Sequence, residues 1–303
     1  MDSFDILVNP PQEVWSVVAR EYVKTNGWDH GPNEYNNWQD TVDVTFFFAV
    51  EKESRNPVAS ISIAKWIERD SGEPFYHIGQ FYVMTHVRGT GLGRTLFQMA
   101  MDKAAGGNVG LSAVLNMAEK YEVAGFDKIL GPWQLVISFQ LEDVKFIEDN
   151  DNFYVKELSE VEFADIHEYD EKICIVERRR YLERSLGSNN VSVNKSGKVT
   201  GFIGVKSVTR DNVKIIAFYA DDQETALALL NQGLKKLLSR KMPINEVTIV
   251  FLSDNHRVLE IVNKLLFGKF ILNASKRQQF TKNVLPIPSH LVYSISESAH
   301  CFV

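Results

Sequence analysis

A glycine-rich turn offers the clearest chemistry in this chain of 303 residues. The turn reads Arg88–Gly89–Thr90–Gly91–Leu92–Gly93–Arg94 and separates an apolar run from a segment with apolar residues at helical spacing. A turn of this kind binds anions, because the first N–H groups and the dipole of the following helix face the ligand. Glycine also lets the main chain approach that ligand closely. The sequence therefore predicts a phosphate site at residues 88–94.

Two nucleotide-binding patterns fail at this turn. A dinucleotide fingerprint needs Gly-x-Gly-x-x-Gly, but the last position holds Arg94 when counted from Gly89 and Leu96 when counted from Gly91. A P-loop needs lysine before its Ser or Thr, and Arg94 stands there instead. The phosphate is therefore expected to belong to another kind of ligand.

Regular elements are predicted on both sides of the turn. Before it, Val14, Val17, Val18 and Tyr22 recur at helical spacing, and the helix is expected to end near Gly27. Strands are predicted at 45–50, 58–67 and 76–83. After the turn, the pattern predicts a helix over 93–104, a strand over 110–115, a helix that ends at Gly125, and a strand over 135–141 that closes the sheet of this half.

The second half repeats the order strand, helix, strand, helix, strand, which indicates an internal duplication in an α/β protein. The predicted elements lie at 214–219, 227–238, 247–252, 258–266 and 291–295. The polar stretch 142–152 predicts a boundary between a domain at 1–142 and a domain at 150–303. In the second domain Asp221, Asp222 and Glu224 begin a helix, where they would repel a pyrophosphate, so only one phosphate site is expected.

Composition limits the possible partners. The 33 basic and 39 acidic residues give a net charge of −6, which argues against nucleic acid as a ligand. Apolar runs are too short to span a bilayer, and Cys174 and Cys301 cannot build a disulfide framework, so a reducing, cytoplasmic compartment and no membrane partner are expected. The seven histidines show no metal-ligand spacing, so no metal site is expected. Oligomeric state leaves no signal in the sequence.

The residues Arg88-x-x-Gly91-x-Gly93 resemble the pyrophosphate turn of the GNAT superfamily of acetyl-CoA-dependent N-acetyltransferases. Downstream, Tyr121–Glu122–Val123–Ala124–Gly125–Phe126 resembles the family's Tyr-x-x-x-Gly-Phe segment, and Gly27–Trp28–Asp29–His30–Gly31 resembles a loop of its two-domain subgroup. The resemblance implies a GNAT fold, with a mixed, mostly antiparallel sheet and flanking helices. A second, divergent GNAT-like domain without a pyrophosphate loop would follow it.

The resemblance also implies a reaction. An amine, either a small molecule or a lysine side chain, would attack the thioester of acetyl-CoA directly in a ternary complex. The turn from Arg88 to Arg94 would hold the pyrophosphate of the co-substrate acetyl-CoA, and the backbone at Tyr82 and Val83 would bind pantetheine and polarise the carbonyl group. Tyr121 matches the tyrosine that protonates the departing thiolate, although an aromatic residue there could also serve only the core.

Several other candidate functional residues have more than one interpretation. His77, Asp29 and His30 are candidates for the general base, and Trp28 and Trp66 for the wall of an amine site, although each residue type is also common in protein cores. Arg178–Arg179–Arg180 is expected on the solvated side of a helix; the alternative is that Asp170 and Arg178 face the cleft between the two domains. Val114 stands where the family often has asparagine. The alternative function is a non-catalytic regulatory protein that binds acyl-CoA.

Overall fold

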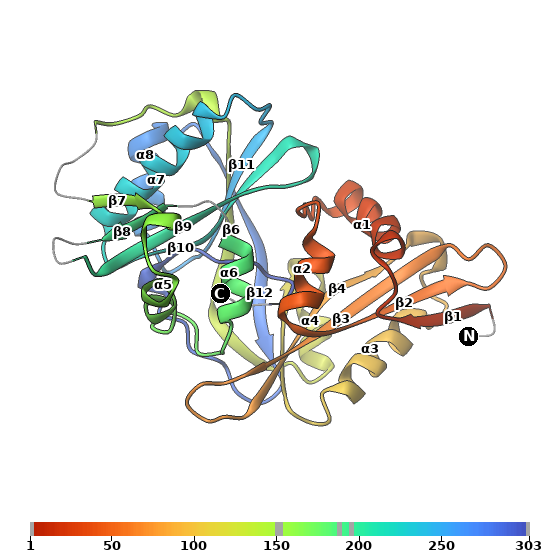
Figure 1. The fold of residues 1–303 in the computed structure, drawn as a ribbon. Helices are drawn as coiled ribbons and strands as arrows, with labels where there is room; N and C mark the ends of the chain where they lie inside the picture. The colour runs from red at the N-terminus through yellow and green to blue at the C-terminus, as the bar shows by residue number, and fades with distance from the viewer. Residues whose placement is uncertain (1–2, 149–153, 187–189, 194–196, 301–303) are drawn as a thin grey trace.

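The computed structural model describes residues 3–148, 154–186, 190–193 and 197–300 (Figure 1). Cys301 lies outside these residues. The strands form one sheet of 13 strands in the order β1-β2-β3-β4-β5-β12-β6-β11-β10-β9-β8-β7, and β13 pairs with β10 off this path. Helices lie against the sheet in both halves, so the predicted α/β class is confirmed. No described helix combines the length and apolar character that a membrane span requires.

The first half contains most of the elements that the sequence predicts. Its helices are α1 (Gln12–Asn26), α2 (Glu34–Thr41), α3 (Leu92–Lys103) and α4 (Ala118–Val123), and its strands are β1 (Phe4–Val8), β2 (Asp43–Glu51), β3 (Pro57–Ile67), β4 (Pro74–Val83), β5 (Asn108–Val114) and β6 (Lys128–Phe139). Gly27 ends α1 with a left-handed φ of 67°, as a glycine after the last helical residue commonly does.

β4 and β5 begin as a parallel pair and then separate. Their pairing runs only from Phe75–Asn108 to Ile78–Leu111, although β4 continues to Val83. Beyond Ile78, β4 pairs with β3 alone among the described strands, so its backbone groups on the β5 side have no partner from these strands. This separation places an open strand edge directly before the glycine-rich turn.

The second half carries the same parallel unit. In it, β10 (Asn212–Ala220) pairs in parallel with β11 (Glu246–Leu252), and α7 (Gln223–Ser239) connects them. The remaining elements are α5 (Phe163–Asp170), α6 (Arg179–Leu186), α8 (Arg257–Leu266), β7 (Tyr154–Glu157), β8 (Asn190–Val193), β9 (Val199–Ser207), β12 (Ile271–Phe280) and β13 (Val292–Ser294).

The two halves exchange strands at the centre of the sheet. β12 of the second half lies between β5 and β6, with Lys276 opposite Val114 on one side and Gln134 on the other. β6 of the first half lies between β12 and β11. The strand predicted at 135–141 therefore exists, but it does not close the sheet of its own half. The domain boundary that the sequence predicts near residue 150 stays a prediction. In space, strands from both sides of this boundary pair with one another.

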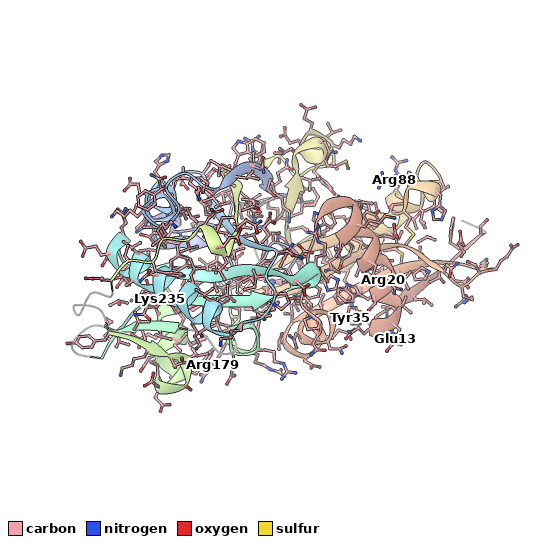
Figure 2. The ribbon with its side chains drawn as sticks, turned by 90° about the horizontal axis from the view of Figure 1, so that it is seen from above. Glu13, Arg20, Tyr35, Arg88, Arg179 and Lys235 are labelled. Carbon is pink, nitrogen blue, oxygen red and sulfur yellow. The ribbon has the colours of Figure 1, made fainter. Side chains whose placement is uncertain are left out.

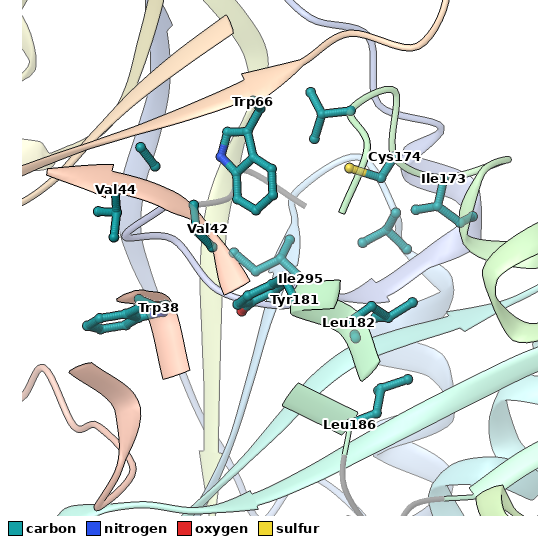
Figure 3. Packing of buried hydrophobic residues seen from close by; sticks show 14 of the residues in the cluster. Trp38, Val42, Val44, Trp66, Ile173, Cys174, Tyr181, Leu182, Leu186 and Ile295 are labelled. Atoms are coloured by element: carbon teal, nitrogen blue, oxygen red, sulfur yellow. The ribbon is translucent and has the colours of Figure 1, made fainter. Parts of the chain in front are cut away.

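A single apolar cluster joins the halves. It contains Trp38 and Trp66 from the first half and Tyr181, Leu182 and Ile295 from the second, all buried (Figure 3). Since burial of such side chains stabilises by about 1.5–3 kcal/mol each, this shared cluster favours one cooperative unit.

Arg178 does not lie on a solvated face. It is 2% exposed, and its guanidinium donates to both carboxylate oxygens of Asp170 at 2.6 and 2.9 Å. The same group donates to Ser296 Oγ at 3.1 Å and Tyr219 Oη at 3.1 Å. The solvated position predicted for the three arginines is wrong for Arg178, which precedes α6 and faces inward with Asp170, whereas Arg179 and Arg180 are exposed.

Candidate functional site

The glycine-rich turn has the backbone that an anion site requires. Gly89 and Gly91 have left-handed φ values of 84° and 85°, and α3 begins directly after them at Leu92. The first N–H groups of an α-helix have no acceptor within the helix, so those of α3 are directed at the turn. A Cβ added at Gly89 or Gly91 would meet no atom within 4 Å, so the space over both glycines is open. These observations fit a bound pyrophosphate.

The other side of the turn is packed against β4. Leu92 is 1% exposed, and a Cβ at Gly93 would lie 3.3 Å from Val83 and 3.4 Å from Phe81, so glycine allows α3 to approach the strand. Arg88 Nε donates to the carbonyl oxygen of Val83 at 2.9 Å. The exposed Arg94, Thr90 and Arg88 surround the turn, and Figure 2 shows Arg88 on the first half, far from Lys235 of α7.

β4 carries a bulge between its pairing with β5 and the turn. The register with β3 shifts there, and Gln80 has a φ of 47°. Gln80 is held on two sides, since its side-chain oxygen accepts from Trp15 Nε1 at 2.7 Å and its carbonyl accepts from Ser60 Oγ at 2.8 Å. A bulge redirects the residues that follow it. It therefore sets the direction of Tyr82 and Val83 toward the turn.

Tyr121 lies in α4 among aromatic rings. Its ring centroid is 6.0 Å from that of Phe97 in α3 and 6.1 Å from that of Phe126. Burial raises the pKa of the Tyr121 phenol to about 12. The hydroxyl therefore keeps its proton at neutral pH and can donate it.

His77 lies in β4 and is fully buried. Its Nδ1 is 3.1 Å from the carbonyl oxygen of Ala299, and we assign the proton to Nδ1 because a carbonyl can only accept. Burial, with the nearby Lys276, lowers its pKa to about 4. The ring is therefore neutral at pH 7.

The C-terminal segment Ile295–His300 reaches β4 from the second half. A Cβ at Gly79 would lie 1.8 Å from the carbonyl oxygen of Ala299, so only glycine allows this contact. His300 Nε2 is 2.8 Å from Ser62 Oγ, and its carbonyl accepts from Trp66 Nε1 at 2.6 Å. The segment therefore forms part of the wall beside His77.

Asp29 bridges the two halves. Its carboxylate accepts from Thr209 Oγ1 at 2.6 Å, Asn212 Nδ2 at 2.8 Å and the Arg210 guanidinium at 2.7 and 2.9 Å. These bonds outweigh the cost of burial and lower the pKa of Asp29. His30 is next to it, with its ring centroid 4.5 Å from that of Trp15. Both positions belong to the contact between the halves.

Trp28 and Trp66 have different surroundings. Trp28 is half-buried, with its ring centroid 5.7 Å from that of Tyr22 and 6.5 Å from that of Tyr82. Trp66 is 4% exposed and packs against Tyr181, with a centroid distance of 6.1 Å (Figure 3). The structure thus brings Trp28 to the β4 side of the candidate site, whereas Trp66 is enclosed between the halves.

Comparison with known proteins supplies the family. Residues 12–124, which include β4, the turn and Tyr121, match the family described as "Acetyltransferase (GNAT) family". Residues 12–124 therefore form a GNAT acetyltransferase domain. No curated protein matches the chain. The glycine-rich turn, the loop 27–31 and Tyr121 lie inside the matched segment, and the recognition made from them is confirmed.

Solved GNAT structures cover the chain at low identity. A putative acetyltransferase from Pyrococcus horikoshii superposes with a TM-score of 0.70 at 17% identity, over 99% of this chain and 96% of that chain. A GCN5-related N-acetyltransferase from Sphaerobacter thermophilus gives 0.60 at 13% identity, over 99% of both chains. A tandem GNAT protein from the clavulanic acid biosynthesis pathway gives 0.63 at 14% identity, over 91% of this chain and 96% of that chain. The whole chain therefore has the fold of GNAT proteins of this length.

The second GNAT-like unit has no equivalent turn. At the start of α7, Asp222 caps the helix by accepting from the Thr225 N–H at 2.7 Å, and Asp221 Oδ1 accepts from Tyr169 Oη at 2.9 Å. The protein's own carboxylates thus occupy the place where a GNAT turn would hold phosphate. This geometry supports the expectation of one site per chain.

The sequence did not point to several residues of the second half that reach the GNAT site. Gln279 of β12 donates to the carbonyl oxygens of Ala118 and Phe126, at 3.1 and 3.3 Å, on both sides of Tyr121. Lys214 and Lys276 extend toward Trp28 and Asp29. Single polar residues are common in strands. Only the run of four polar residues Lys276–Arg277–Gln278–Gln279 could have indicated a functional role for this segment.

Two other features lie outside the GNAT site. His167, Glu171 and Glu177 have ligand atoms within 4.8 Å of one another, but Arg69 forms ion pairs with both glutamates and already offsets part of their negative charge. A cavity of about 630 Å³ lies in the second half, lined by Glu157, Ser185, Leu186, Val205, Lys206, Ser207, Lys236 and Arg240.

Proposed function

We propose that this GNAT protein transfers an acetyl group from acetyl-CoA to an amine, by direct attack of the amine in a ternary complex. The observation that carries the proposal is the separation of β4 from β5 immediately before an open, left-handed glycine turn. The separated strands leave backbone groups for pantetheine, and the turn offers N–H groups to the pyrophosphate. The residues proposed to hold acetyl-CoA are Tyr82, Val83, Arg88, Gly89, Thr90, Gly91, Leu92, Gly93 and Arg94.

The proposed reaction balances without a further reagent. The amine nitrogen attacks the thioester carbonyl carbon, and a C–N bond forms as the C–S bond breaks. The backbone N–H groups of β4 after Ile78, which pair with no strand on the β5 side in the described part of the chain, stabilise the negative charge that develops on the carbonyl oxygen. The nitrogen loses one proton, and the departing thiolate gains one.

Tyr121 is the proposed donor of the proton that the thiolate gains. Its phenol is protonated at neutral pH because burial raises the pKa to about 12. An apolar environment raises the pKa of a thiol in the same way, so the ring cluster that holds Tyr121 also favours the thiol product. Tyr121 is thus proposed as a general acid.

His77 remains the proposed acceptor of the proton from nitrogen. Its Nδ1–H is directed at Ala299, so Nε2 carries the free lone pair. A general base works best when its pKa is near the working pH, and a pKa of about 4 makes His77 a weak one. The amine is therefore expected to react mainly in its neutral form, and the rate should rise with pH as the amine loses its proton.

The experiment that tests the proposal measures thiol release from acetyl-CoA in the presence of small amines and of a lysine peptide. Release that depends on an amine, with the acetylated amine identified by mass spectrometry, supports transfer. Binding of acetyl-CoA by calorimetry without release for any amine would instead support a non-catalytic acyl-CoA-binding protein. Absence of binding would remove both functions.

A further inference from the structure

Two lysines of the second half lie between the halves without an acidic partner. Lys214 in β10 donates to the main-chain carbonyl oxygen of Asp29 at 2.6 Å. Lys276 in β12 donates to Ser298 Oγ, and its Nζ lies 5.9 Å from the centroid of the Trp28 ring. Among the described residues, no carboxylate oxygen lies within 4.0 Å of either ammonium group. As whole residues, both lysines are half-buried.

The charges around these lysines do not cancel. Glu34 is paired with Lys206, and Asp29 is paired with Arg210. Lys214 is attracted by Asp29, Glu34 and Glu297 and repelled by Lys206, whereas Lys276 is repelled by Lys214 and attracted by Glu297. Once the two ion pairs are counted, Glu297 is the remaining carboxylate among these groups. The ammonium groups of Lys214 and Lys276 are therefore accompanied by the single carboxylate of Glu297, and the region between the halves has an excess of positive charge.

This arrangement is costly in the absence of an anion. Burial lowers the pKa of both groups; the like charge of Lys206 adds to this at Lys214, and that of Lys214 adds to it at Lys276, whose pKa is lowered to about 8. Buried charges in folded proteins are normally paired, since an unpaired one loses its hydration without compensation. Strongly perturbed groups of this kind concentrate at functional sites. The excess charge therefore points to a ligand that supplies the missing anion.

The lysines lie on the acceptor side of the proposed reaction. Trp28 and Tyr82 belong to the cluster that covers one face of the β4 region, whereas Phe97 and Leu92 of α3, beside the pyrophosphate turn, belong to a different cluster. Lys276 is close enough to His77 to lower its pKa. The ammonium groups are thus near the reacting end of β4 but separate from the turn that would hold the phosphates of acetyl-CoA.

We propose that the acceptor of the transfer is a small amine that also carries an anionic group, a carboxylate or a phosphate, and that Lys214 and Lys276 bind this group. The inference rests on the proposed acetyl transfer and names the class of its substrate. A charge-assisted hydrogen bond to each lysine would hold the anion, while the half-buried Trp28 covers the carbon chain. Polyamines and other purely cationic amines would meet repulsion from the same lysines.

The experiment compares amines that differ only in the anion. An amino acid is tested beside its carboxamide and its decarboxylated amine, and an aminoalkyl phosphate beside the corresponding amino alcohol. We expect kcat/KM to be about 10- to 100-fold higher for the anionic member, as charge-assisted bonds would give. The carboxylate and phosphate series show which anion is preferred.

Lys276→Met is the decisive variant. It should abolish the preference for the anionic member of each pair, because the anion loses its charge-assisted bond. Removal of a buried unpaired charge should not lower thermal stability. Lys264→Met, which removes an exposed lysine of α8, is the matched control and should keep the preference. Binding of the amino acid, measured as a rise in melting temperature, should be lost in the Lys276 variant alone.

The outcomes separate the two proposals. If neutral and anionic amines are acetylated equally well, or if Lys276→Met keeps the preference, the assignment of the lysines is overturned while acetyl transfer stands. If no amine is acetylated although acetyl-CoA binds, acetyl transfer itself fails.

Discussion

The hydroxyl of Tyr121 is the smallest feature on which the chemistry depends. Tyr121→Phe removes one proton donor and little volume. If the hydroxyl protonates the thiolate, kcat should fall about 10²- to 10⁴-fold with little change in acetyl-CoA affinity, as is typical of general acid catalysis. Steady-state kinetics and calorimetry measure the two quantities. Tyr76→Phe, in the same sheet, is the control and should keep full activity. A full-rate Tyr121 variant with a lowered melting temperature would make the residue a core tyrosine.

Gly91 combines a left-handed backbone with open space above it. Gly91→Asp places a carboxylate where the pyrophosphate is proposed to bind, so acetyl-CoA binding should be lost, whereas the unchanged protein should bind one molecule per chain. Gly72→Asp is a close control, because Gly72 also has a left-handed φ, of 70°, and also has no atom within 4 Å of an added Cβ. Calorimetry should show normal affinity for that variant. Equal affinity in both variants would place the pyrophosphate elsewhere.

At the scale of elements, β12 positions α4. Gln279→Leu removes the two side-chain bonds to Ala118 and Phe126 while keeping a similar volume. Stability should fall by about 1–3 kcal/mol because buried carbonyl groups lose their donor. A displaced Tyr121 should also lower kcat by up to about 10²-fold with acetyl-CoA affinity retained. Gln98→Leu, on the exposed face of α3, is the control. A stability loss with normal kcat would show that α4 holds its place without Gln279.

Local patterns explain which elements the sequence could predict. Apolar spacing predicted α1, α3, α7 and α8, and β-branched and aromatic runs predicted β2, β3, β4 and β11, because one face of each element is buried. β12 was missed because its central residues Lys276–Gln279 are polar, and they are polar because they reach the candidate site and α4. Its exchange with β6 could not be predicted either, since no local signal records which half a strand joins.

Some features of the candidate site could likewise be predicted from the sequence, and others could not. The turn could be predicted because glycines at a strand–helix junction reflect a local backbone requirement. The bridging role of Asp29 could not, because its partners Thr209, Arg210 and Asn212 lie about 180 residues away in the sequence. The burial of Arg178 likewise depends on contacts with Tyr219 and Ser296, which lie 41 and 118 residues away in the sequence.

At the scale of the whole molecule, lowering the pH should weaken the contact between the halves. His77, with a pKa of about 4, and His300, whose pKa burial also lowers, are held neutral where the C-terminal segment meets β4. The unfolded chain, with a histidine pKa near 6.5, binds more protons between pH 6.5 and pH 4. Stability is therefore complete above pH 6.5 and falls as the pH drops, by up to about 3 kcal/mol for His77.

Denaturant unfolding across this range measures the effect. His77→Asn keeps a donor near Ala299 without an imidazole and should flatten the slope between pH 6.5 and pH 4. His290→Asn, at an exposed position, should leave the slope as it is. If the slope is the same in all three proteins, protonation of His77 does not contribute.

The exchange of β6 and β12 also affects synthesis on the ribosome. When β5 has been made, its neighbour β12 is still about 165 residues away. At about 5–20 residues per second, the edge of β5 waits roughly 10 to 30 s for its partner. An uncovered strand edge can pair with another nascent chain in that time. Codons that slow translation between the two strands should therefore lower the yield of folded enzyme, even though they change no amino acid.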